Sequence, residues 1–232
     1  MPGYTDRIGI ATVNRGRVVE HSDLLANQTV LTIELSDGHS FDIVCSPVDF
    51  LWLAYGYLVT EGYILWGEKP VLIEQSASRM YIELERTRRA EPIPVESDYT
   101  TTSAVVCRQV AQFVTGGKVF METGATHSAA ISSSDSILCT AEDVSRSSAL
   151  QKVFGHAYLK DLELQHMILI LSCRVPVAFI SKVARAGIPL IAAVSAPTLQ
   201  AVEKAEQLGI CLCGFVRGNR MNVYSSKWRL GL

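Results

Sequence analysis

The second half of the chain has a repeating rhythm that constrains its fold more than any other feature. Short apolar runs at 167–173, 188–195 and 210–216 alternate with amphipathic stretches at 175–187 and 196–209. The runs have the length of buried strands, while the stretches have helical spacing and end in glycine. Strands that alternate with helices predict a largely parallel sheet covered by helices. We therefore expect an α/β domain here.

The first half has a different pattern, in which strands dominate. Residues 29–45 and 70–87 each carry two apolar runs around a short polar turn, which predicts two hairpins. Between them we predict a helix with Ser46 as its N-cap, Pro47 in its first turn and Gly62 at its end. The overall class is thus α+β.

A polar, proline-bearing stretch at 88–102 is typical of a linker and sets the expected domain boundary. We predict a β-rich N-terminal part with one helix at 1–98 and an α/β domain at 99–232. The α/β domain should open with an amphipathic helix at 103–117. Residues 127–143 are interpreted as a helix start or loop followed by a strand.

Composition excludes several classes of protein. The net charge of −2 and the 19% of charged residues provide no basic surplus for nucleic acid. There is no run of about 18 apolar residues and no apolar signal core at the start, so we expect neither a membrane partner nor export. The expected compartment is the cytoplasm.

The six cysteines show no pattern of a metal or disulfide site. There is no C-x-x-C pair and no zinc-type spacing of cysteine and histidine, so no metal site is predicted. Cys211 and Cys213 point to the same face of a predicted strand, and their apolar neighbours favour packing over a reactive thiol site. The His-x-Glu and Pro-Cys-x-x-Cys signatures of zinc deaminases are also missing, which argues against that activity.

Three loops follow the predicted parallel strands, where α/β sheets bind ligands. They span 172–175, 194–198 and 215–220, and they combine arginines with serine, threonine and glycine. Arginines and free backbone N–H groups suit phosphate oxygens. The alternative is that Ser195 is an ordinary N-cap and the arginines are solvated. The candidate ligand-binding residues are Arg174, Ser195, Thr198, Phe215, Val216, Arg217, Gly218, Asn219 and Arg220.

A fourth candidate segment, 121–134, places His127 among small residues that include Thr123 and Gly124. Small residues let a backbone approach a ligand, and the imidazole can accept or donate a proton. A capping threonine beside a structural histidine is the plainer interpretation.

Five motifs in order carry a resemblance to a known family. They are Gly-Tyr-Leu-x-x-Glu-Gly at 56–62, Thr-Gly-x-x-His at 123–127, Glu-Asp-Val-x-Arg at 142–146, Ser-Ala-Pro-Thr at 195–198 and Gly-Phe-x-Arg at 214–217. With them the chain resembles the formate dehydrogenase accessory proteins, the FdhD family, over roughly residues 18–225.

The resemblance implies a cytoplasmic, homodimeric sulfurtransferase. Such a protein takes sulfur from a cysteine desulfurase as a persulfide and passes it to the molybdenum bis(molybdopterin guanine dinucleotide) cofactor of formate dehydrogenase. The implied fold joins a β-rich part to a domain like cytidine deaminase. Residues 215–220 match the cofactor-binding loop of the family, and His127 matches its histidine. Arg146, Lys152 and Arg174 remain as basic anchors.

The chain departs from the family at its cysteine motif, because it contains no Cys-Gly-x-Cys-Gly. Either Ala104 and Cys107 align with the two cysteines, or the cysteine loop is deleted. Cys107 is the candidate sulfur carrier only if its thiol is exposed. Whether the protein is an enzyme therefore stays open, as does the choice of a molybdenum or tungsten client. One alternative is a non-catalytic chaperone that binds guanine nucleotides or the cofactor. A plainer one is a subunit that only holds a protein partner.

Overall fold

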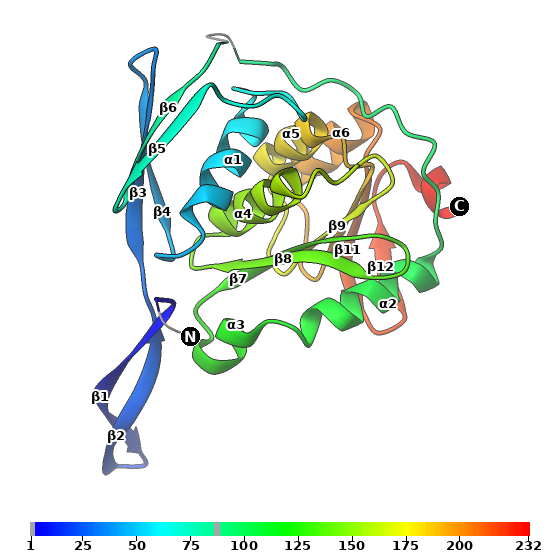
Figure 1. The fold of residues 1–232 in the computed structure, drawn as a ribbon. Coiled ribbons are helices and arrows are strands. Elements are labelled where there is room, and N and C mark those ends of the chain that lie inside the picture. Colours follow the sequence, from blue (N-terminus) through cyan, green and yellow to red (C-terminus); the bar gives the residue numbers. More distant parts are fainter. Residues whose placement is uncertain (1–2, 86–88) are drawn as a thin grey trace.

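The computed structural model describes residues 3–85 and 89–232, and within them it forms three sheets and six α-helices (Figure 1). The mixed α/β class expected from the sequence is confirmed.

The largest sheet has six strands in the order β12-β11-β10-β9-β7-β8. Its strands are β7 (His127–Ser132), β8 (Ile137–Asp143), β9 (Ile168–Leu171), β10 (Leu190–Ala193), β11 (Cys211–Arg217) and β12 (Arg220–Val223). Only β9, β10 and β11 run parallel, while β7 is antiparallel to β8 and β9, and β12 to β11. The expected largely parallel sheet is therefore mixed.

Helices cover both faces of this sheet (Figure 1). On one face lie α4 (Arg146–Leu159), α5 (Val177–Ala186) and α6 (Leu199–Gln207), and on the other lie α2 (Ser103–Val114) and α3 (Lys118–Thr123). Alternate residues along each central strand join opposite cores, as Leu169 and Ile170 do. The helices expected at 103–117, 175–187 and 196–209 are confirmed.

Two elements of this half differ from the expectation. The expected helix start or loop at 127–132 is strand β7, because Ala129, Ala130 and Ile131 are all buried and pack on both faces of the sheet. Helix α4 was not anticipated, since residues 148–155 are buried without interruption and leave little amphipathic periodicity to detect.

The N-terminal part contains a four-stranded sheet in the order β4-β3-β6-β5. Both predicted hairpins are present, although residues 86 and 87 of the second lie outside the described residues. The strands are β3 (Thr29–Leu35), β4 (Ser40–Cys45), β5 (Leu72–Ser76) and β6 (Arg79–Glu83).

The helix of this part, α1 (Phe50–Glu61), ends at Gly62 as predicted but begins later than predicted. Its N-cap is Asp49, with a left-handed φ of 55°, and not Ser46. Ser46 is fully buried and binds the α/β domain instead, since its N–H donates to Asp143.

Helices α1 and α4 join the two parts in near backbone contact. A Cβ at Gly56 would lie 1.6 Å from the Gln151 carbonyl oxygen, and one at Gly155 would lie 1.8 Å from that of Trp52. Only glycine permits this approach. Because one apolar core runs through both parts, the predicted division at 98/99 does not separate two independent cores.

A two-stranded ribbon of β1 (Thr5–Asn14) and β2 (Arg17–Ala26) projects from the body (Figure 1) and was not anticipated. Residues 89–102 contain no helix or strand, as expected of a linker, while Arg88 lies outside the described residues.

Candidate functional site

One edge of the six-stranded sheet collects the loops singled out in the sequence. His127 opens β7 opposite Asp143 at the end of β8. Leu171, the last residue of β9, faces Ala129 on one side and Ala193 on the other. The start of β7 and the ends of β8, β9, β10 and β11 therefore share this edge, which we call the carboxyl edge.

Hydrogen bonds tie the loops of the carboxyl edge to one another. The Ser128 N–H donates to Ser172 Oγ at 2.9 Å, and the Phe215 N–H donates to the Ser195 carbonyl at 3.1 Å. Val175 forms a parallel bridge with Pro197. These bonds position the loops as one surface and not as separate tips.

The Arg-Gly-Asn-Arg turn is the tip of the β11–β12 hairpin. Arg217 and Arg220 face each other in register, Gly218 has a φ of 56°, and Asn219 completes the turn. All four residues are exposed, and neither arginine forms an ion pair with another described residue.

Phe215 and Val216, which precede this turn in β11, differ from it and from each other in exposure. Phe215 has a left-handed φ of 52° at a bulge, and its ring is 39% exposed beside the loop of Ser195. The Val216 side chain is 1% exposed and packs in the core next to α2, so only its backbone is available to a ligand.

One positive and one negative charge act on the partly buried His127. Burial lowers the pKa of His127, and the neighbouring Arg146 lowers it further against the opposing charge of Asp143. The imidazole is therefore neutral near pH 7. Arg146 and Arg174, both exposed, also face Cys173, although burial still raises the pKa of that thiol to about 11.

Several candidate residues have local structural roles, although not the roles that the plainer interpretations gave them. Thr198 caps α6, and its side chain accepts the Ala201 N–H, whereas Ser195 is not an N-cap. Thr123 donates to the Val119 carbonyl, and Gly124 ends α3 with a φ of 67°.

Two acidic residues that were not among the predicted site residues stabilise the carboxyl edge through contacts with neighbouring elements. Glu142 accepts the Val119 and Phe120 N–H groups and so holds α3 against β8. Asp143 is fully buried and pairs with the fully buried Lys152 at 2.7 Å. Lys152 is therefore not the basic anchor that the family resemblance implied, because its charge is held in the interior. The Glu-Asp-Val sequence was the available signal, but nothing in it revealed the burial.

Cys107 does not belong to the carboxyl edge. The next residue, Arg108, donates to the carbonyl of Ser134. Ser134 follows the last residue of β7, whereas His127 is the first residue of that strand, so the two lie at opposite ends of β7. Cys107 is 6% exposed in an apolar cluster, and burial raises its pKa. The exposed thiol required for its predicted role is not found.

The other thiols are also buried. Cys211 and Cys213 are fully buried with their sulfurs 3.9 Å apart, which confirms packing on one strand face. A hydrogen bond to Cys211, together with burial, raises the pKa of Cys213. Across residues 3–85 and 89–232, no group of three or more metal-ligating side chains is assembled.

The fold defines a class of protein, namely a mixed α/β protein whose sheet carries several loops and chain ends along one edge. Residues 76–231 match the model of the FdhD/NarQ family, and the chain belongs to this family.

Curated relatives cover the same length. The sulfur carrier protein FdhD of Shouchella clausii is 30% identical over 94% of this chain and 93% of its own length. That of Geobacillus kaustophilus is 27% identical over 99% of both. A crystal structure assigned to a formate dehydrogenase accessory protein of Desulfotalea psychrophila superposes with a TM-score of 0.86 at 22% identity, covering 98% of this chain and 99% of its own. No helix in the described part of the chain has the length and apolarity needed to span a bilayer.

Proposed function

We propose that this protein is a sulfur carrier for formate dehydrogenase maturation and that it binds the guanine dinucleotide ends of the molybdenum cofactor at the carboxyl edge. Its relatives in the FdhD/NarQ family are named sulfur carrier proteins. In this proposal the cofactor is cargo, the client is formate dehydrogenase, and the site of action is the cytoplasm.

The observation that carries the proposal is the meeting of separate basic loops at one edge. Arg146, Arg174 and the Arg217/Arg220 pair come from three different segments, and all four side chains are exposed there. A diphosphate offers several anionic oxygens to such a set, and guanidinium groups bind them in a bidentate manner. An exposed arginine set of this kind is a poor match for an apolar ligand.

The remaining edge residues suit the rest of a nucleotide. The exposed ring of Phe215 provides a flat face on which a guanine base stacks. Neutral His127 accepts or donates one hydrogen bond, and the small residues Thr123 and Gly124 let the backbone approach the ligand. Asn219 and Gly218 at the hairpin tip contribute further amide groups.

Calorimetric titration with GDP tests this binding. We expect saturable binding that Arg217→Ala weakens by about tenfold or more, because hydrogen bonds to a charged group contribute about 1.5–3 kcal/mol each. Arg79→Ala is the matched control, since Arg79 is an exposed arginine on β6, outside the carboxyl edge. Equal losses in the two variants, or no GDP binding by the wild type, would refute the assignment.

Sulfur transfer is the less supported half of the proposal. A persulfide donor, here a cysteine desulfurase, must reach a thiolate on this chain, and all six thiols are buried. That burial favours a second reading, in which the protein is a chaperone that binds the cofactor without carrying sulfur. Either reading allows the homodimer that the family resemblance implies.

Mass spectrometry separates the two readings. The protein is incubated with a desulfurase and cysteine, and the gain of one sulfur atom is sought on wild type and on Cys107→Ala. Sulfur on the wild type alone assigns the carrier to Cys107. If both the wild type and Cys107→Ala gain sulfur, the carrier is another cysteine. If neither protein gains sulfur, the result supports the chaperone.

A further inference from the structure

A cavity lies at the end of the central strands opposite to the carboxyl edge. It encloses about 550 Å³ and is lined by residues 93–96 of the linker, 161–165 before β9 and 184–187 before β10. These segments precede the parallel strands, so the cavity is remote from the carboxyl edge. We call it the acidic groove.

The walls of the acidic groove are largely apolar and partly open to solvent. Ile93 is 67% exposed and Leu65 is 42% exposed, and both line the groove. Trp66 lines it as well, and its indole N–H donates to the Leu162 carbonyl, so the ring is held in place. Large apolar side chains left in water at a concave site mark a binding surface.

The rim of the groove carries four carboxylates, Glu91, Glu96, Asp161 and Glu163, all of them exposed. None forms an ion pair with another residue in the described ranges.

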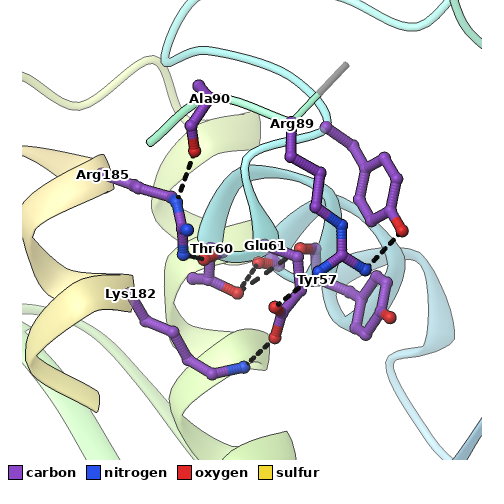
Figure 2. Close-up of polar contacts among 9 residues, drawn as sticks. Tyr57, Thr60, Glu61, Arg89, Ala90, Lys182 and Arg185 are labelled. Carbon is purple, nitrogen blue, oxygen red and sulfur yellow. Dashed lines mark hydrogen bonds and ion pairs between the residues drawn. The ribbon is translucent and has the colours of Figure 1, made fainter. Parts of the chain in front are cut away.

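The one cationic side chain among the described residues that line the groove, Arg185, is hydrogen-bonded to backbone carbonyls. Figure 2 shows its guanidinium donating to the carbonyls of Ala90 and Thr60, each at 2.9 Å. Next to it, Glu61 pairs with Lys182 and lies 3.8 Å from Arg89. These contacts fix the linker as a wall of the groove. The carbonyls do not neutralise Arg185, so its one positive charge stands against the four carboxylates and the groove stays acidic.

One buried polar group in the groove has no partner. Tyr158 lines the groove and is 4% exposed, and its hydroxyl makes no hydrogen bond to any described residue. A buried hydroxyl without a partner costs about 1–3 kcal/mol, so such groups call for an explanation. Burial raises the pKa of Tyr158 to about 12, and the charges of Tyr55 and Asp161 add to that shift.

We propose that the acidic groove binds a segment of a partner protein in which arginine or lysine side chains flank large aliphatic ones. The aliphatic side chains cover Ile93 and Leu65, and the cations meet the four carboxylates. This inference does not depend on the function proposed for the carboxyl edge.

The test uses a fluorescein-labelled peptide with a core of Arg-Leu-Leu-Arg and follows its anisotropy on titration with the full chain. Two control peptides replace the arginines by glutamate or the leucines by serine. We expect binding of the first peptide alone. The double variant Glu91→Lys/Glu163→Lys should weaken it about threefold to tenfold, since each exposed pair contributes about 0.2–1 kcal/mol. Glu74→Lys, an exposed carboxylate on β5 outside the groove, should leave binding unchanged.

Three results would overturn the proposal. The first is no binding of the Arg-Leu-Leu-Arg peptide, and the second is equal affinity for spermidine, which would indicate a site for small amines. The third is self-association of the wild type that Glu91→Lys/Glu163→Lys abolishes, which would assign the groove to a second copy of this chain.

Discussion

The carboxyl edge and the acidic groove lie at opposite ends of the same strands and have opposite chemistry. The edge presents four exposed arginines in a loop and at the ends of strands and a helix, while the groove presents four carboxylates around apolar walls. Four of the 21 basic residues thus lie at one end of the central sheet and four of the 23 acidic residues at the other. Separate ends allow two ligands of different charge to bind without competing for space.

The two regions also differ in what supports them. Under the edge, Lys152 and Asp143 form a fully buried ion pair, and Asp143 also accepts the Ser46 and Ser145 N–H groups. Around the groove, the exposed wall residues Ile93 and Leu65 contribute little to the core. Edge and groove should therefore respond very differently to substitution.

The largest effect is expected from Lys152→Met, which leaves the Asp143 carboxylate buried without its cation. Removing one partner of a buried pair costs about 3–5 kcal/mol, whereas Ile93→Ala in the groove wall should change stability by less than about 0.5 kcal/mol. The free energy of unfolding in urea measures both.

The double variant Asp143→Leu/Lys152→Met is the control for this pair. Replacing both charges by apolar groups should recover most of the lost stability, because no uncompensated charge is left. If Lys152→Met were as stable as wild type, the pair would not be what supports the edge.

An intermediate effect is expected when one charge is reversed in each region. Arg217→Glu should weaken GDP binding by about tenfold to a hundredfold and leave the Arg-Leu-Leu-Arg peptide unaffected. Glu91→Lys/Glu163→Lys should do the reverse. Calorimetry and anisotropy on the same preparations give both numbers, and a variant that weakened both ligands would show that edge and groove are coupled.

The carboxyl edge could be anticipated from the sequence because its signals are local. Arg217, Gly218 and Arg220 follow an apolar run, and parallel strands place their carboxyl ends together. The burial of Val216 and the capping role of Thr198 needed the structure, since both depend on which side of the chain faces the sheet.

The acidic groove could not be anticipated, because no short stretch contains it. Leu65, Ile93, Tyr158 and Arg185 come from four segments that only the packing of α1, α4 and α5 brings together. The same holds for Ser46. It was predicted as an N-cap, but its N–H donates to Asp143, which is 97 residues away in the sequence. Long-range burial of polar groups leaves no periodic trace in a sequence.

The smallest effect is expected from pH and concerns His127. In the free protein, burial and Arg146 hold the pKa of His127 below its usual value of 6.5. A bound phosphate offsets the field of Arg146 and favours the imidazolium, so its pKa rises on binding and a proton is taken up. Affinity for GDP should therefore gain a contribution as the pH falls from 7.5 to 5.5, on the order of threefold. GDP itself gains a proton near pH 6, which acts in the opposite direction. The quantity to measure is thus the ratio of wild-type to His127→Gln affinity at each pH. A ratio that stays constant across this range would place His127 away from the phosphates and leave the arginines as the whole of the anion site.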